Sequence, residues 1–139
     1  MKGEERMYLL VVGGGKVGFA LARDLIQSGH EVTLIEKQPE RAQWLARLLG
    51  GAVLCGDGTN PETLREGGIE RADVVIAVSG HDEDNYAISR IATAFKTGTH
   101  VIARVNDPRN EEIFRRIGVR TVSSTRTIAE MIEESVPHP

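Results

Sequence analysis

The sequence has one cysteine, few aromatic residues and no long apolar run, and each of these shortages excludes a class of protein. A single cysteine, Cys55, cannot supply the disulfide framework of a small secreted domain, and we expect it to be a small buried residue. Aromatic residues make up 4% of the chain and the formal net charge is -3, which argues against a basic, base-stacking surface for nucleic acid. No apolar run approaches the roughly 20 residues that span a bilayer, so we expect no direct membrane insertion. The N-terminal residues also lack the apolar core of a signal peptide, and we predict a cytoplasmic protein.

A glycine-rich segment near the N-terminus has the form of a nucleotide-binding loop. The apolar residues 7–12 run directly into G-x-G-x-x-G, with glycines at positions 13, 15 and 18, and an amphipathic helix pattern follows. Gly13 allows a tight turn, Gly15 allows a phosphate to approach the backbone, and Gly18 allows the helix to pack close to the sheet. The N–H groups at the start of that helix then face the phosphates. A strand before the motif and a helix after it are the context in which the motif is informative.

An acidic residue follows at the expected distance. The apolar stretch 30–36 is predicted to be the second strand, and it ends at Glu36, 18 residues after Gly18. In this type of fold an acid about 20 residues beyond the glycines accepts hydrogen bonds from a ribose; the alternative is a surface glutamate at a strand end. A carboxylate there would repel a 2′-phosphate and so favours NAD or a plain adenine nucleotide over NADP, although Lys37 could offset the repulsion.

Strand-like and helix-like segments then alternate to the end of the chain. Further strands are predicted at 52–55, 72–78, 100–104 and 119–122, and helices at 39–49, 61–66, 83–96, 108–117 and 125–135. This alternation predicts an α/β, three-layer Rossmann fold with a six-stranded parallel sheet in the order 3-2-1-4-5-6. We expect a single domain over 7–135, a disordered lead over 1–6 and a short tail over 136–139.

Patterns typical of catalysis and metal binding are missing. The four histidines are scattered, and there is no Ser-His-Asp set and no Tyr-x-x-x-Lys. The acidic run 82–84 is best explained as the start of a helix, where negative charge is stabilising. Hydride transfer needs a proton donor or acceptor beside the cofactor, so we do not expect an enzyme. A small NAD-dependent oxidoreductase or dehydrogenase fragment is the alternative, and an interaction module without a ligand is a third hypothesis.

Four segments together resemble a known family. They are VVGGGKVG, VTLIEKQPER, GDGTNPETLREGGIERADVVIAVSGHDEDN and VIARVNDPRNEEIFRRIGVRTV. In this order and spacing they resemble the N-terminal nucleotide-binding domain of the TrkA/KtrA-type potassium-transport regulators, also called the RCK, KTN or TrkA-N domain. The resemblance covers the chain from Met7 to about Ile132.

The resemblance implies regulation instead of catalysis. Domains of this family bind NAD(H), ATP, ADP or AMP, form dimers and higher rings, and lie on the cytoplasmic side of a membrane-embedded potassium channel or transporter. A ligand-dependent change of dimer geometry controls that partner. Many members carry a second, C-terminal domain, so this chain is either a stand-alone form or a part that ends at the domain boundary. The family's dimer crosses over at the last helix, whose apolar face would be an unusual monomer surface; it consists of Ile128, Met131, Ile132 and Val136.

The resemblance also implies roles for single residues. Glu36 would bind the ribose, and Lys16 would meet terminal phosphates of its own or the neighbouring subunit's ligand, with a solvated lysine as the alternative. Asp57 would lie at the adenine end or instead cap the helix at 61–66. Arg104 would reach phosphates or pair with an acid across the dimer. The predicted nucleotide-binding residues are Gly13, Gly14, Gly15, Lys16, Val17, Gly18, Glu36, Lys37, Gly56, Asp57, Gly58, Thr59, Val78, Ser79 and Arg104.

Overall fold

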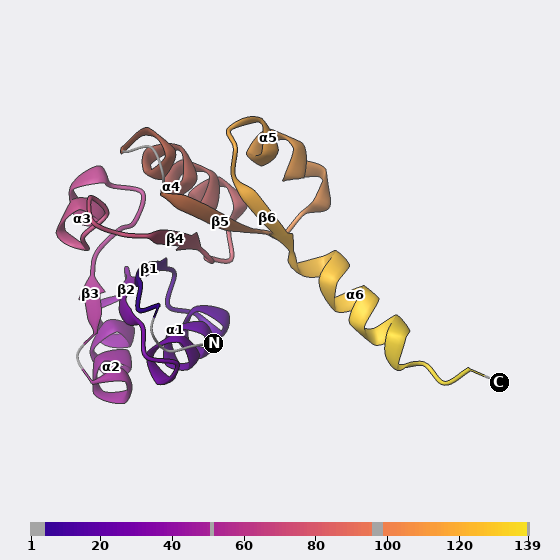
Figure 1. The fold of residues 1–139 in the computed structure, drawn as a ribbon, viewed down its shortest axis with the longest axis horizontal. Coiled ribbons are helices and arrows are strands. Elements are labelled where there is room, and N and C mark those ends of the chain that lie inside the picture. The colour runs from indigo at the N-terminus through magenta and orange to yellow at the C-terminus, as the bar shows by residue number, and fades with distance from the viewer. Residues whose placement is uncertain (1–4, 51, 96–98, 139) are drawn as a thin grey trace.

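A computed structural model describes residues 5–50, 52–95 and 99–138, and it contains a parallel sheet with helices on both faces (Figure 1). The strands lie in the order β3-β2-β1-β4-β5-β6, and all neighbouring pairs are parallel. They are β1 (Tyr8–Val12), β2 (Glu31–Glu36), β3 (Val53–Cys55), β4 (Val74–Ala77), β5 (His100–Val105) and β6 (Arg120–Ser123). The predicted fold class and strand order are confirmed.

The helices connect the strands close to the predicted bounds. They are α1 (Lys16–Gln27), α2 (Pro39–Leu49), α3 (Pro61–Glu66), α4 (Asp82–Phe95), the 3-10 helix η1 (Pro108–Asn110), α5 (Glu111–Arg116) and α6 (Ser124–Ser135). The predicted helix 108–117 is divided in two, and the side chain of Asp107 caps its first part by accepting from the Arg109 N–H. Residues 1–4 of the predicted lead, and residue 96 at the predicted end of the fourth helix, lie outside the described residues.

Proline, asparagine and glycine explain where α2 and α3 begin and end. Pro39 and Pro61 each occupy the first turn of their helix, where a missing N–H group costs nothing. The side chain of Asn60 accepts a hydrogen bond from the Glu62 N–H at 3.0 Å and so caps α3. Helix α2 ends at Leu49, and the next residue, Gly50, has a φ of 72° in the left-handed region that glycine adopts readily.

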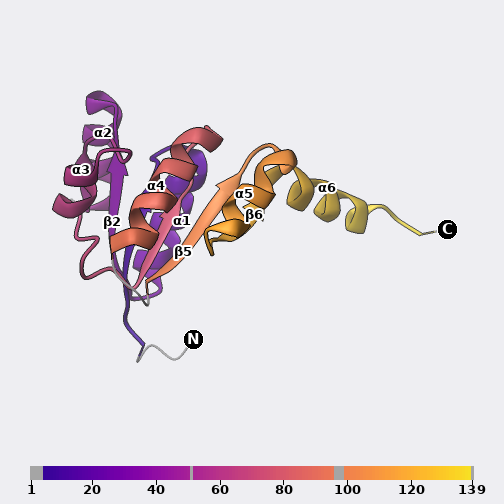
Figure 2. The same ribbon diagram turned by 90° about the horizontal axis from the view of Figure 1, so that it is seen from above.

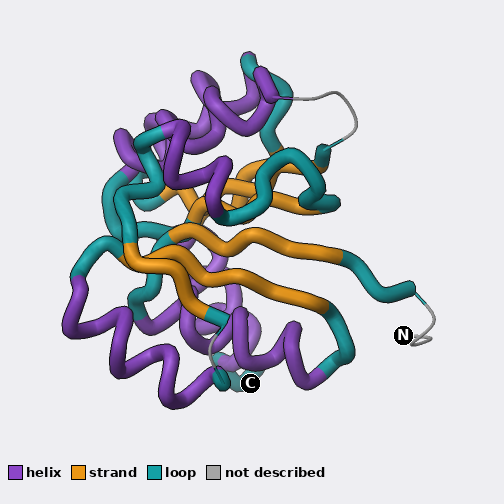
Figure 3. Tube along the Cα trace, turned by 90° about the vertical axis from the view of Figure 1, so that its left-hand side faces the viewer, coloured by secondary structure: helices purple, strands orange, loops and turns teal. Residues whose placement is uncertain are grey.

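The sheet is buried on both faces, and Figures 2 and 3 show it between two layers of helices. Alternate residues of one strand point into different cores. In β1, Leu10 packs in the core that contains Ile88 of α4, whereas Leu9 packs in the core that contains Leu45 of α2. All residues of β1 are buried, which explains why the strands read as continuous apolar runs.

Cys55 is exposed, so the expectation that it is buried was wrong. It is the last residue of β3, which has three residues and forms one edge of the sheet. A strand end at a sheet edge has neighbours on one side only, and burial at such a position cannot be inferred from residue type.

Helix α6 projects away from the sheet in both ribbon views (Figures 1 and 2). None of its residues is buried. The apolar residues expected to form an exposed face are indeed exposed, with Met131 and Ile132 each at 62%. The described chain therefore carries an apolar helix face without a partner.

Candidate functional site

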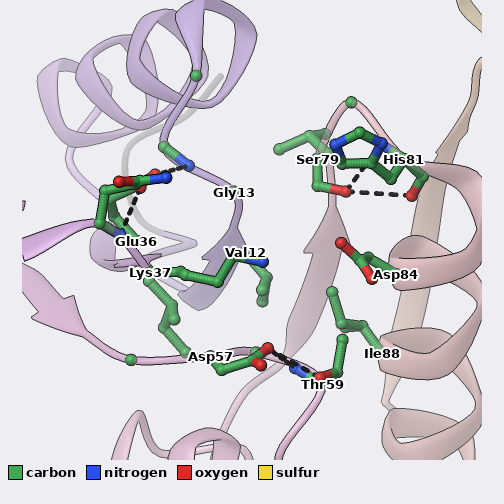
Figure 4. A pocket seen from close by; sticks show the side chains of 18 of the residues that line it. Val12, Gly13, Glu36, Lys37, Asp57, Thr59, Ser79, His81, Asp84 and Ile88 are labelled. Atoms are coloured by element: carbon green, nitrogen blue, oxygen red, sulfur yellow. Dashed lines mark hydrogen bonds between the residues drawn. The ribbon is translucent and has the colours of Figure 1, made fainter. Parts of the chain in front are cut away.

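A cavity of about 400 Å³ lies at the carboxyl ends of β1 and β4, where the strand order reverses (Figure 4). Ligands of doubly wound sheets bind at this switch point. The lining residues are Val12, Gly13, Gly14, Gly15, Ile35, Glu36, Lys37, Gln38, Gly56, Asp57, Gly58, Thr59, Val78, Ser79, Gly80, His81, Asp84, Ile88 and Arg104.

The glycine loop has the geometry that its spacing predicts. Gly13 has a φ of 121°, and a Cβ there would lie 2.8 Å from the backbone nitrogen of Ser79. A Cβ on Gly18 would lie 1.7 Å from the carbonyl oxygen of Gly13, so only glycine lets α1 pack this closely beneath the loop. No atom lies within 4 Å of a Cβ built on Gly15, and no side chain caps α1 there. The loop therefore leaves open space beside backbone N–H groups that can receive a phosphate.

Glu36 connects the glycine loop to the turn after β2. Its side chain is 8% exposed; Oε1 accepts from the Gly14 N–H at 3.0 Å, and Oε2 accepts from the Gln38 N–H at 2.8 Å. A Cβ on Gly14 would lie 2.6 Å from Oε1, so the middle glycine makes this contact possible. Each carboxylate oxygen keeps a further lone pair that can accept from a hydroxyl.

Arg41 supports the same loop from outside the cavity, a role that the sequence analysis missed. Its Nε donates to the Gly14 carbonyl oxygen, and its guanidinium lies 5.2 Å from the centre of the Trp44 ring. No spacing rule connects position 41 with the loop, because the contact depends on how α2 packs against β2 and α1.

Asp57 lies across the cavity and does not cap α3, since Asn60 takes that position. Its Oδ1 accepts from the backbone N–H of Thr59 at 2.9 Å and from the Thr59 hydroxyl at 2.8 Å. These two hydrogen bonds are the main reason that the pKa of Asp57 is lowered. The carboxylate is therefore ionised at neutral pH and available as an acceptor at the cavity wall.

The opposite wall comes from the segment after β4 and from β5. The Ser79 hydroxyl donates to the carbonyl oxygen of His81 and accepts from its N–H, and Figure 4 shows Ser79, His81 and Asp84 on this side. The Nε of Arg104 is buried and has no hydrogen-bond partner in the described parts of the chain. This wall thus combines an acid that lines the cavity with an arginine whose buried Nε has no partner among the described residues.

Three of the predicted residues do not line the cavity. Lys16 and Val17 are exposed on the first turn of α1, and Gly18 is buried beneath the loop. All other predicted residues are brought together there, although no bound ligand tests their roles. The lining residues that the sequence analysis missed are Val12, Ile35, Gln38, Gly80, His81, Asp84 and Ile88. Position along the chain could have predicted most of them, because all but Ile88 and Asp84 lie at or just beyond the end of a strand.

The acidic run 82–84 does lie in the first turn of α4, as expected, but two of its members have further contacts. Asp84 lines the cavity, and Asp82 binds a neighbouring loop. Within the described residues, no group of three or more His, Cys, Asp or Glu side chains could hold a metal ion. No helix in that part of the chain is long and apolar enough to cross a membrane.

A doubly wound parallel sheet, a glycine loop between β1 and α1 and an acid at the end of β2 define a nucleotide-binding domain of the Rossmann class. The model of the TrkA-N domain family matches residues 9–125. The chain belongs to the TrkA-N domain family.

Curated relatives carry names from potassium uptake. The chain is 40% identical over 134 residues to the Trk system potassium uptake protein TrkA homolog of Methanothermobacter thermautotrophicus, covering 96% of this chain and 62% of that protein. It is 38% identical over 132 residues to TrkA of Streptomyces coelicolor, covering 94% and 59%. The chain thus spans about three fifths of the length of these relatives.

Solved structures share the fold. The TrkA-N domain of the inner membrane protein ybaL from Escherichia coli has a TM-score of 0.87 at 24% identity, with 96% of this chain and 99% of that chain covered. The GsuK channel, solved with NAD, has a TM-score of 0.77 at 25% identity, with 91% and 23% covered. A GsuK structure bound to ADP has a TM-score of 0.79 at the same identity, with 91% and 33% covered.

Proposed function

We propose that this chain is a regulatory domain that binds an adenine nucleotide and controls a membrane-embedded potassium channel or transporter from the cytoplasmic side. The observation that carries the proposal is the cavity in which the Glu36 carboxylate is held 3.0 Å from the Gly14 N–H, beside the open position at Gly15. An acceptor for a ribose beside donors for a phosphate is the arrangement that the proposed ligand needs. The names of the TrkA relatives, and the NAD and ADP bound to GsuK, support the same function.

The cavity supports a definite ligand orientation. The adenosine lies toward Glu36, Lys37 and Asp57, and the phosphates lie on the glycine loop. NAD(H), ATP, ADP and AMP share the adenosine and first phosphate. The groups beyond that phosphate, which differ among these ligands, lie toward the wall formed by Ser79 and Arg104. Lys16 lies outside the cavity, so contact with a neighbouring subunit's ligand is the role that its position favours.

The regulatory step requires a second subunit. We propose that the apolar face of α6 forms a homodimer, which can extend to a higher ring, and that the nucleotide changes the geometry of this assembly. The exposure of Ile128, Met131 and Ile132 supports the dimer, because a face of this size on a lone helix is unfavourable in water.

Calorimetric titration with NAD, NADH, ATP, ADP and AMP tests the binding, with Glu36→Gln as the variant. Loss of hydrogen bonds to a charged acceptor should weaken the ligand by about 1.5–3 kcal/mol. Glu40→Gln, an exposed acid in the first turn of α2, is the matched control and should bind as the wild type does. Failure of all five nucleotides to bind would remove the proposal, and steady NADH oxidation with a carbonyl substrate would favour the oxidoreductase alternative.

A further inference from the structure

Asp82, the first residue of α4, binds the loop that follows β5. Its Oδ1 accepts from the backbone N–H of Asn106 at 2.6 Å and from the Asn106 side-chain amide at 3.0 Å. Oδ2 accepts from the Asp107 N–H at 2.9 Å and from the Asn110 side chain at 2.8 Å. Burial by itself raises the pKa of Asp82, but these hydrogen bonds together outweigh it and lower the pKa. The ionised carboxylate therefore holds the loop with charge-assisted bonds.

Asn85 joins this region to the cavity wall. Its side chain is fully buried; the Oδ1 accepts from the Ser79 N–H at 2.9 Å, and the Nδ2 donates to the carbonyl oxygens of Ser79 and Arg104, each at 2.9 Å. Ser79 and Arg104 both line the cavity. A ligand that displaces either residue must therefore also displace Asn85 or leave a buried amide unpaired, which is costly.

Asn106 connects the same region to α6. Its backbone carbonyl oxygen accepts from the Thr125 hydroxyl at 3.1 Å, and its side-chain oxygen accepts from the Ser124 hydroxyl at 3.4 Å. Its side-chain amide donates to Asp82 and, at 3.5 Å, to the Ser79 carbonyl oxygen. One residue thus contacts both the cavity wall and the first turn of α6.

A second side-chain contact of α6 leads to the same segment after β5. Arg126 donates two hydrogen bonds to the carboxylate of Glu111, which is 5% exposed. Glu111 directly follows Asn110, which Asp82 holds. No residue of α6 is buried, so beyond its junction with β6 at Ser123 this helix is held by its hydrogen bonds to Asn106 and Glu111.

We propose that Asp82, Asn85, Asn106 and Asn110, which we call the Asp82 network, couple the occupancy of the cavity to the direction of α6. The inference rests on the proposed nucleotide binding and deepens it by naming the residues that carry the regulatory change. Coupling of this kind requires two arrangements of the network that the ligand binds with different affinity. Asp82 and Asn85 are positioning residues, because neither lines the cavity.

The geometry of α6 makes the effect measurable. Glu134 lies ten residues after Ser124, which corresponds to about 15 Å of helix. A rotation of about 20° at the base would therefore move Glu134 by about 5 Å. Labels on cysteines introduced by Arg47→Cys and Glu134→Cys, in a Cys55→Ser background, report this displacement by pulsed electron resonance. Dilution with unlabelled chain keeps the measured distances within one subunit.

Asp82→Asn is the decisive variant because it preserves size and reverses hydrogen-bond character. The amide nitrogen of the new asparagine would replace one carboxylate oxygen, and each of these oxygens accepts from two donors. Whichever way the side chain turns, a donor would therefore face two donors. Glu83→Gln, in the same turn and exposed, is the control with the same change of charge. Thr125→Val removes only the hydroxyl that contacts Asn106, at an exposed position, and keeps the test valid if Asp82→Asn does not fold.

Distances are measured without ligand and with saturating NAD, ATP, ADP and AMP in turn. We expect at least one nucleotide to shift the distances in the wild type and in Glu83→Gln. Asp82→Asn and Thr125→Val should lose at least half of that shift, although their Kd for the nucleotide stays within threefold of the wild-type value. Full shifts in both network variants, or bound nucleotide without a shift in the wild type, would overturn the inference and leave nucleotide binding intact. A wild type that binds none of the four would overturn both.

Discussion

Gly15→Ala should separate nucleotide binding from folding, because position 15 is open in the free protein. No atom lies within 4 Å of the added Cβ, and the backbone there has φ -72° and ψ -164°, which alanine adopts without strain. Alanine reduces the conformational freedom of the unfolded chain, which stabilises the folded protein by about 0.4–1 kcal/mol. Alanine at a helix N-cap destabilises it by a similar amount. The free energy of unfolding should therefore change by less than about 1 kcal/mol.

Nucleotide affinity should fall, in contrast, because the methyl group occupies the space through which a phosphate reaches the loop. A tenfold or greater rise in Kd, equivalent to about 1.4 kcal/mol or more, is the expected result. Gly18→Ala, in contrast, should lower the stability of the folded protein. Its Cβ would lie 1.7 Å from the Gly13 carbonyl oxygen, and overpacking of this kind costs about 1–3 kcal/mol or more.

Urea unfolding without nucleotide, followed by calorimetric titration of the folded variants, measures both quantities. An unchanged Kd in Gly15→Ala would show that no phosphate approaches this glycine and would refute the assigned orientation. A strongly destabilised Gly15→Ala would contradict the open space from which the prediction starts.

Three further predictions concern selectivity, assembly and pH. NADP should bind at least about tenfold more weakly than NAD in a competition titration, because its 2′-phosphate meets the buried Glu36 carboxylate; equal affinity would contradict this. Ile132→Asp should lower the mass found by light scattering from dimer to monomer, whereas Glu133→Gln should leave it unchanged; a monomeric wild type at concentrations well above micromolar would contradict the dimer. Asp82 has a lowered folded-state pKa, so its stabilisation is complete above the unfolded value of about 3.9 and is lost as pH falls through the folded value. As pH falls across this range, the free energy of unfolding measured in urea should decrease less steeply in Asp82→Asn than in the wild type. Equal slopes of this free energy against pH would refute the prediction.

The predicted strands and glycine loop were accessible from the sequence because they depend on local chemistry. Buried parallel strands must be apolar on both faces, and the close packing of the turn after β1 on the start of α1 accepts only glycine at positions 13 and 18. Right-handed crossovers then leave few possible strand orders. Spacing alone pointed to Glu36, whereas Asp57 and Arg104 were expected at the cleft from the family resemblance; all three line one cavity, since the carboxyl ends of parallel strands share an edge.

The sequence by itself therefore determined the α/β fold, the strand order and the position of the cleft. Only the tertiary structure decided that Cys55 is exposed, that Arg41 supports the glycine loop and that Lys16 lies outside the cavity. It also decided that Asp82 binds Asn106, 24 residues away, and that Thr125 of α6 donates a hydrogen bond to the same residue. The physical reason is that the spacing of apolar residues and the composition show which face of a helix or strand is buried. Hydrogen bonds between distant loops depend instead on how the packed elements place individual atoms.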